Sequence, residues 1–259
     1  MKVVILAGGL GTRLSEETNS KPKPMVTIGG MPIIWHIMKF YSSYGLNDFI
    51  ICCGYKGYLI KEFFQNYFLH TSDVTIDVSK NSIQVLNKSK ENWKITLVDT
   101  GEKTSTGGRL MRVKKYLNDQ KNFCFTYGDG LSNVNLKSQI KFHLSHKKLA
   151  TILAVQPPAR FGALDIAGEK VIGFSEKQNL NNEIGFINGG FFILSTKCIN
   201  LIENDETVWE KEPLENLANQ HQLMAYKHKD FWQPMDTLRE KNILENLWNS
   251  NTAPWKIWK

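Results

Sequence analysis

Long apolar runs are missing from this sequence of 259 residues. No stretch approaches the ~18–20 residues needed to span a bilayer, so we expect no membrane partner. The apolar residues at 3–6 run directly into a glycine loop with a use in the mature protein. They therefore make no signal peptide, and we expect the protein to stay in the cytoplasm.

Cysteine is scarce as well, with four residues in the chain. Cys52 and Cys53 are adjacent, and neighbouring residues of a strand point to opposite faces, so they are poor partners for a disulfide. No Cys-x-x-Cys pair suggests zinc, and we expect four buried thiols. His143 and His146 have no evident third ligand, and we expect them on a solvated helix face without chemistry.

Signatures of nucleophilic catalysis and of nucleic-acid binding are also absent. No Ser/His/Asp or Cys/His arrangement can be recognised, and no DNA- or RNA-binding motif occurs. The formal net charge is +7, but the basic residues are scattered rather than clustered, which argues against a nucleic-acid partner. An anionic small substrate fits better, since positive potential at a cleft speeds its capture.

What the sequence does contain is a glycine-rich loop directly after a strand-like run. The run 3–6 predicts a buried first strand, and Gly8, Gly9, Gly11 and Arg13 follow it. Glycines let backbone N–H groups approach a polyphosphate, and a helix beginning after the turn aims its positive end at the same charge. This pattern predicts a phosphate-binding loop.

Two familiar phosphate loops are excluded by the residues present. No Gly-Lys-Ser/Thr run of a Walker A loop occurs, and Leu14 stands where a dinucleotide loop has its third glycine. A glycine turn without any ligand is the remaining alternative. Arg13 and Lys23, two nearby cations, make that alternative less favourable.

Strand-like and helical runs alternate through the first half of the chain, which predicts a parallel α/β sheet. A hairpin is expected within 74–98, and shorter strands follow residue 157. The apolar tail 253–258 is expected to dock on the body or on another subunit. Strands are predicted at 3–6, 49–53, 74–78, 82–85, 95–98, 123–127, 151–155, 163–166, 171–175 and 189–194, and helices at 33–44, 58–68, around 140–144, 212–218 and 237–249.

Several of these runs together resemble the sugar nucleotidyltransferases, and among them the glucose-1-phosphate cytidylyltransferases, nearly from end to end. The runs that carry the resemblance are 8–14 (GGLGTRL), 14–18 (LSEET), 21–25 (KPKPM), 51–58 (ICCGYKGY), 98–101 (VDTG), 126–130 (TYGDG), 187–192 (INGGFF) and 231–237 (FWQPMDT). The resemblance implies a Rossmann-like, mainly parallel mixed sheet flanked by helices, with the inserted hairpin and a sugar-binding subregion. It also implies one domain over 1–259, in which 1–155 mainly bind nucleotide and 156–259 mainly bind sugar and pack the C-terminus.

The implied reaction joins CTP and glucose 1-phosphate to give CDP-glucose, used in bacteria for the deoxysugars of surface polysaccharide, and pyrophosphate. A sugar phosphate is already an anion, so no protein nucleophile is needed and catalysis reduces to alignment and charge neutralisation. Arg13 is expected over the triphosphate, and Lys23 between the α-phosphate and the sugar phosphate. Relatives form homo-oligomers, which we expect here, with the hairpin as a candidate subunit contact or cover of the site.

Asp129 is the first expected ligand of Mg²⁺ and a catalytic residue. It follows the predicted strand 123–127 within Gly128-Asp129-Gly130, at the strand end where ligands of open α/β sheets collect. A simple turn is the alternative reading of these residues. Asp236 matches the second metal carboxylate of the family, and two carboxylates suit Mg²⁺.

The remaining site residues come from the resemblance. Arg109 is expected to donate to the base carbonyl, or else the segment is a helix N-terminus capped by Thr106. The expected nucleotide-binding residues are Leu6, Ala7, Gly8, Gly9, Gly11, Thr12, Arg13, Thr104, Gly108, Arg109 and Gly128. The expected sugar-phosphate-binding residues are Lys23, Gly162, Glu176, Lys177, Asn188 and Gly189.

Two departures from the family pattern concern the sugar loop and the first turn. Gln178 replaces the usual proline after Glu-Lys, and Thr27 replaces an acidic residue. Neither change removes a catalytic charge, but both bear on loop rigidity and sugar selectivity. The alternatives are an enzyme for UTP, dTTP or another hexose phosphate, and a non-catalytic regulatory subunit that binds nucleotide sugar.

Overall fold

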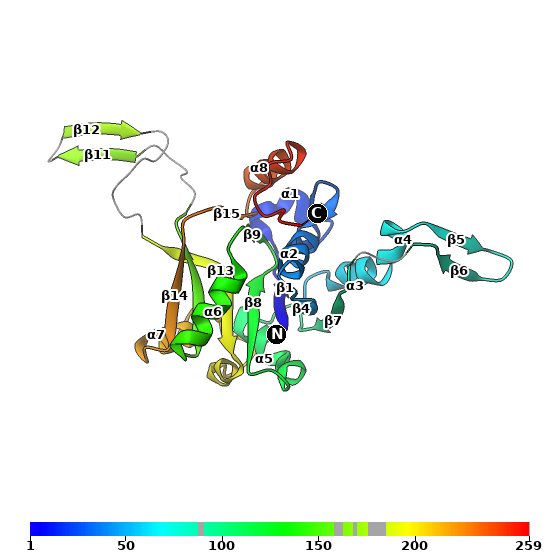
Figure 1. Ribbon diagram of the computed structural model, residues 1–259, viewed down its shortest axis with the longest axis horizontal. Coiled ribbons are helices and arrows are strands. Elements are labelled where there is room, and N and C mark those ends of the chain that lie inside the picture. Colours follow the sequence, from blue (N-terminus) through cyan, green and yellow to red (C-terminus); the bar gives the residue numbers. More distant parts are fainter. Residues whose placement is uncertain (88–90, 158–162, 168–169, 176–184, 259) are drawn as a thin grey trace.

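A seven-stranded sheet forms the centre of the protein, in the order β14-β10-β13-β8-β1-β4-β7 (Figure 1). The computed structural model describes residues 1–87, 91–157, 163–167, 170–175 and 185–258. Neighbouring strands run parallel except for β13, which is antiparallel to both β8 and β10. The strands are β1 Val3–Ala7, β4 Asp48–Cys53, β7 Lys94–Asp99, β8 Asn122–Tyr127, β10 Ala150–Val155, β13 Ile187–Ser195 and β14 Leu223–His228.

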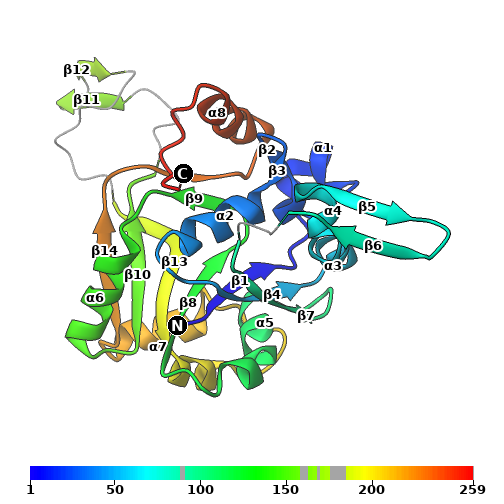
Figure 2. The same cartoon turned by 45° about the vertical axis from the view of Figure 1, so that its right-hand side comes forward.

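The predicted α/β fold is therefore confirmed, and the alternation of side chains explains it. Val3 and Ile5 of β1 belong to the apolar cluster on one face of the sheet, and Val4 and Leu6 to the cluster on the other. Both faces are covered by helices, as continuous apolar strands require (Figure 2). Helices α2 Ile33–Ser42, α3 Gly57–Gln65, α6 Leu136–His146 and α8 Leu238–Asn249 contribute to the first cluster, and α5 Thr106–Arg112 and α7 Glu212–Asn219 to the second.

Four small two-stranded ribbons are attached to this core, and they include the predicted hairpin β5–β6, which projects from the body (Figure 2). The predicted helix 58–68 is two helices, because the backbone of Asn66 leaves the helical region between α3 and α4. The further elements are α1 Ser15–Thr18, α4 Tyr67–Thr71, β2 Thr27–Ile28, β3 Met31–Pro32, β5 Val74–Asp77, β6 Ser82–Val85, β9 Gly130–Ser132, β11 Ala163–Ala167, β12 Lys170–Ser175 and β15 Trp232–Pro234. No helix in the described ranges has the length and apolar character to cross a membrane.

The four cysteines and His143 lie in the core, and His146 is half-buried. All four thiols are free and buried, as predicted. The solvated face expected for His143 and His146 is wrong, since α6 packs on β10 and both rings hydrogen-bond the Thr151 hydroxyl, at 2.9 and 2.8 Å. Burial lowers the pKa of His143 to about 4, which keeps the ring neutral.

The apolar tail docks on its own chain, which confirms one of the two expected arrangements. Trp255 is fully buried and stacks on Phe231 and Trp248, with ring centroids 5.6 and 6.4 Å apart. Its indole N–H also donates to His36 on α2, at 3.3 Å. The tail therefore packs against α8 and α2 through Trp255.

Replacing Trp255 by alanine is expected to lower the free energy of unfolding by about 3–5 kcal/mol, the usual cost of removing a large buried aromatic ring. Ile257→Ala is the matched control in the same tail, because Ile257 is 45% exposed. Urea unfolding measures both variants. A loss no larger for Trp255→Ala than for Ile257→Ala would contradict the contribution of Trp255 to the core.

Candidate active site

The glycine loop and Asp129 meet at one edge of the sheet because the two strands that precede them are parallel neighbours. Strands β1 and β8 pair in register up to Leu6 and Tyr127, so the residues that follow both strands emerge together. Gly128 lies against the backbone of β1, and a Cβ at this position would approach the Leu6 carbonyl oxygen to 2.6 Å. Only glycine allows this contact between the two loops.

Asp236 reaches the same place through a ribbon formed much later in the chain. Strand β9 starts directly after Asp129, and β15, which ends just before Met235, pairs with it antiparallel. The Met235 N–H donates to the Asp129 carbonyl oxygen at 2.8 Å. The ribbon thus sets the two aspartates side by side although 106 residues separate them in the sequence.

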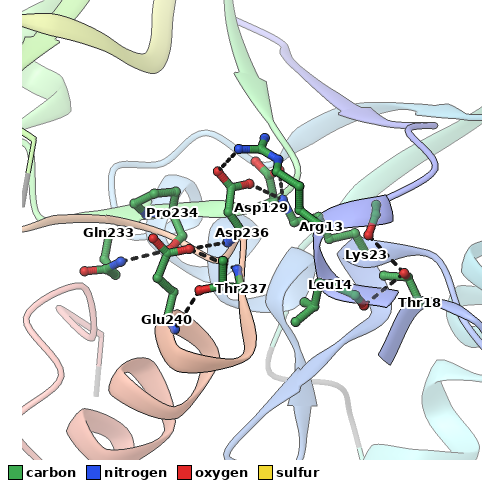
Figure 3. Close-up of polar contacts among 11 residues, drawn as sticks. Arg13, Leu14, Thr18, Lys23, Asp129, Gln233, Pro234, Asp236, Thr237 and Glu240 are labelled. Carbon is green, nitrogen blue, oxygen red and sulfur yellow. Dashed lines mark hydrogen bonds and ion pairs between the residues drawn. The ribbon is translucent and has the colours of Figure 1, made fainter. Parts of the chain in front are cut away.

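Two carboxylates and two cations form the centre of the site (Figure 3). The Lys23 ammonium lies 2.6 Å from a carboxylate oxygen of Asp129 and 2.6 Å from one of Asp236. The Arg13 guanidinium lies 2.7 Å from the other oxygen of Asp236. Three ion pairs thus link all four predicted charges in one cluster.

Lys23 is held firmly while Arg13 is largely open to solvent. The Lys23 side chain is 10% exposed and that of Arg13 72% exposed. Burial alone would lower the pKa of Lys23, but the adjacent carboxylates, Asp129 first, raise it above its ordinary value. Lys23 therefore stays charged, and its single helical turn, bounded by Pro22 and containing Pro24, fixes the backbone that carries it.

A capping box at the start of α8 fixes the backbone of Asp236. The Glu240 carboxylate accepts from the N–H groups of Asp236 and Thr237, at 2.7 and 3.0 Å, and the Thr237 hydroxyl accepts from the Glu240 N–H. Sequence reasoning did not identify Glu240 as part of the site. Its signal was present, because Thr-x-x-Glu before a helix is the sequence pattern of a capping box.

The helix expected after the glycine loop is present but short. The segment forms a single 3-10 turn and the four-residue helix α1, which is too short to carry a sizeable dipole. Gly11 has a positive φ of 67°, and its carbonyl oxygen accepts from the Thr18 hydroxyl at 3.0 Å. An ion pair between Glu17 and Lys241 ties α1 to α8.

Arg109 lies 4% exposed beneath the glycine loop. Its guanidinium donates to the carbonyl oxygens of Gly8, Gly101 and Glu102, at 3.0, 2.6 and 3.0 Å, and to the Thr100 hydroxyl at 2.8 Å. Arg109 therefore braces two loops of the chain, and its contact with a base carbonyl stays a prediction. The close packing also explains Gly8, where a Cβ would lie 2.1 Å from the guanidinium.

The alternative of a Thr106 cap on the following helix is wrong. Ser105 is the N-cap residue of α5 and makes no side-chain cap, and the Thr106 hydroxyl instead donates to the Glu210 carboxylate at 2.6 Å. Thr104, another predicted residue, is buried beside this helix start. The loop is thus fixed by the segment before α7.

The predicted sugar residues are only partly within the structure. Asn188 and Gly189 stand at the start of β13, which is antiparallel to β8 and therefore begins at the edge where β8 ends. The Asn188 side-chain amide donates to the Tyr127 hydroxyl at 3.2 Å. Gly162, Glu176 and Lys177 lie outside the described residues.

The metal ligands proposed from the sequence stay a pair. Within the described part of the chain, no three His, Cys, Asp or Glu side chains come close enough to form a metal cluster. Asp129 and Asp236 both contact one ammonium group, so their oxygens converge on a position that already holds a cation. Two converging carboxylates match the few protein ligands that Mg²⁺ takes beside phosphates and water.

Comparisons with known proteins agree with this architecture. A profile described as nucleotidyl transferase matches residues 2–238. Over the full length of both chains, the sequence is 59% identical to glucose-1-phosphate cytidylyltransferase of Salmonella typhimurium and 45% identical to the probable glucose-1-phosphate cytidylyltransferase of Bacillus subtilis.

Solved structures show the same fold. HddC from Yersinia pseudotuberculosis superposes with a TM-score of 0.68 at 25% identity, over 95% of this chain and 99% of that one. A UDP-glucose pyrophosphorylase complexed with UDP-glucose superposes with a TM-score of 0.67 at 14% identity, over 96% and 98% of the two chains. The chain therefore belongs to the nucleotidyl transferase family, and within it to the glucose-1-phosphate cytidylyltransferases.

Proposed function

We propose that this protein transfers a cytidylyl group from CTP to α-D-glucose 1-phosphate, giving CDP-glucose and pyrophosphate. The observation that carries the choice of substrates is the 59% identity to a glucose-1-phosphate cytidylyltransferase over the full length of both chains. The charged cluster of Arg13, Lys23, Asp129 and Asp236 supports the type of reaction. We also propose that it acts in the cytoplasm.

The chemistry needs no covalent intermediate with the protein. A phosphate oxygen of glucose 1-phosphate attacks the α-phosphorus of CTP, and the bond to the β-phosphate breaks with pyrophosphate as leaving group. The protein has to bring two anions together in line and balance their charge. In this proposal Lys23, held between two carboxylates, neutralises the phosphates that meet, and the exposed Arg13 stabilises the departing pyrophosphate.

We propose that Asp129 and Asp236 hold the Mg²⁺ that enzymes of this type use. The ion would neutralise phosphate charge when bound. In the structure these carboxylates accept from Lys23 and Arg13, and phosphate oxygens offer the two cations equivalent acceptors. Lys23 and Arg13 can thus exchange the carboxylates for phosphates without losing an ionic partner.

We propose that nucleotide and sugar bind on different sides of this edge of the sheet. The glycine loop and the loop before α5 lie within 1–155, on the nucleotide side, and Asn188 and Gly189 on the sugar side. We also propose a homo-oligomer. Its support is the hairpin β5–β6, where Ile76, Val78 and Ile83 are 59, 87 and 59% exposed.

A substrate panel tests the proposed function. Purified protein with Mg²⁺ and glucose 1-phosphate is expected to release pyrophosphate fastest with CTP. Base choice depends on a few loop contacts, so UTP or dTTP is the competing substrate. A clear preference for either of these would replace the cytidylyl assignment, and no turnover with any triphosphate would favour a regulatory subunit.

Charge removal is expected to reduce turnover more than binding. Lys23→Met and Asp129→Asn should each lower kcat by about 10²-fold or more, as for other groups that stabilise transition-state charge. Asp230→Asn is the matched control, because Asp230 is an exposed acid just before β15. Full activity of Asp129→Asn in a folded protein would contradict its role as a metal ligand.

Arg109→Lys is expected to weaken both stability and CTP binding. A lysine cannot reach every acceptor of the guanidinium, and each buried carbonyl left without a donor costs about 1–3 kcal/mol. Arg112→Lys is the control on the same helix, since Arg112 and its partner Asp205 are 41% and 43% exposed and solvent weakens their interaction. Urea unfolding and the KM for CTP are the measurements. Equal effects of both variants would argue against a stabilising role for the hydrogen bonds of Arg109 to the two loops.

A further inference from the structure

An unbroken series of hydrogen bonds crosses the site from the sugar side to the base side. The Asn188 amide donates to the Tyr127 hydroxyl at 3.2 Å, and that hydroxyl donates to one oxygen of the Glu210 carboxylate. The other oxygen of Glu210 accepts from the Thr106 hydroxyl at 2.6 Å. The Thr106 hydroxyl in turn accepts from the backbone N–H of Trp209 at 2.9 Å.

The Glu210 side chain serves both hydroxyls at once, because each of its two oxygens accepts from one of them. Each hydroxyl accepts one hydrogen bond and donates its own proton, so both need an acceptor at Glu210. The 2.6 Å distance from Thr106 lies in the range of charge-assisted O–H to carboxylate bonds.

On the base side, Glu210 belongs to the segment 205–210, which is hydrogen-bonded to the start of α5. The N–H groups of Gly107 and Gly108 donate to the Thr207 carbonyl oxygen at 3.0 and 3.3 Å, and the Ser105 N–H to that of Asp205 at 2.8 Å. The contact is so close that a Cβ at Gly108 would lie 2.4 Å from the Asp205 oxygen. The segment 205–210 therefore sets the position of the predicted base loop.

On the sugar side, the same carboxylate fixes the end of β8. Tyr127 is the last residue of β8, two positions before Asp129, and its ring packs against Gly190, where a Cβ would approach to 2.5 Å. The Asn188 side chain is held at both ends, because its oxygen also accepts from the Gly190 N–H at 2.8 Å. A shift of the Tyr127 hydroxyl therefore changes the position of the Asn188 amide that donates to it.

We propose that Glu210 is a positioning residue that couples the two substrate subsites. Through Tyr127 it orients Asn188 on the sugar side, and through Thr106 it orients the base loop. The inference rests on the proposed function, which assigns sugar binding to Asn188 and base binding to the loop. Its distinctive consequence is that a change on one side alters the affinity for the substrate on the other side.

Three variants test this coupling by steady-state kinetics of pyrophosphate release. Tyr127→Phe, which removes a hydroxyl on the sugar side, is expected to raise the KM for CTP about 5-fold or more, and Thr106→Val to raise the KM for glucose 1-phosphate similarly. Glu210→Gln is expected to raise both. The double variant of Tyr127→Phe and Thr106→Val should be less impaired than the product of the single effects, because both break one network.

Two further variants separate positioning from loss of structure. Thr106→Ser keeps the hydroxyl and is expected to restore both KM values to within about 2-fold of the wild type. Glu206→Gln makes the same chemical change as Glu210→Gln at an exposed acid of the same segment and is expected to leave both KM values unchanged. Thermal unfolding of every variant shows that it is folded.

Effects confined to each variant's own substrate, with multiplicative losses in the double variant, would overturn the coupling. Failure of the proposed function looks different, because it appears in the wild type as turnover with another triphosphate or sugar phosphate. The same cross-effects are then measured with that pair of substrates. If the wild type turns over no pair, the Kd for CTP, with and without glucose 1-phosphate, gives the coupling directly: an unchanged Kd would refute it.

Discussion

The ammonium of Lys23, held between Asp129 and Asp236, is the interaction on which the site depends. It joins three segments that are far apart in sequence, the turn after the glycine loop, the end of β8 and the start of α8. A lysine buried to this extent is costly without a charged partner, and removal of one partner leaves charge uncompensated. The prolines beside Lys23, the ribbon β9–β15 and the capping box of α8 all hold these three groups in place.

Much of the fold could be predicted from the sequence because its causes are local. Apolar runs and helical periods predict the strands and most helices, and the rule that ligands collect at strand ends points to Asp129. The break at Asn66 was missed, because it does not interrupt the apolar pattern of residues 58–68. The meeting of Lys23 with Asp236 could not be derived from periodicity, since the ribbon that produces it pairs segments about a hundred residues apart.

The directions of polar side chains were the harder part. Arg109 and Arg112 are one helical turn apart, yet the first braces buried carbonyls and the second pairs with Asp205 near solvent. Nothing in their spacing tells the two apart, because the difference depends on which loops cover the helix. Glu210 lies in a segment without apolar periodicity, so sequence patterns gave no reason to connect it with Tyr127.

The charged cluster also has a consequence for how the protein meets its substrates. The two cations and two carboxylates are joined by three ion pairs and sum to zero net charge, so the cluster itself attracts a distant anion only weakly. Long-range attraction of a triphosphate must therefore come from the basic residues scattered over the remainder of the chain, which give it a formal net charge of +7. Selectivity for phosphate develops only at contact, when the two cations exchange one set of oxygens for another. An anion that accepts from only one of the two cations would replace only part of the ionic contacts that the aspartates make.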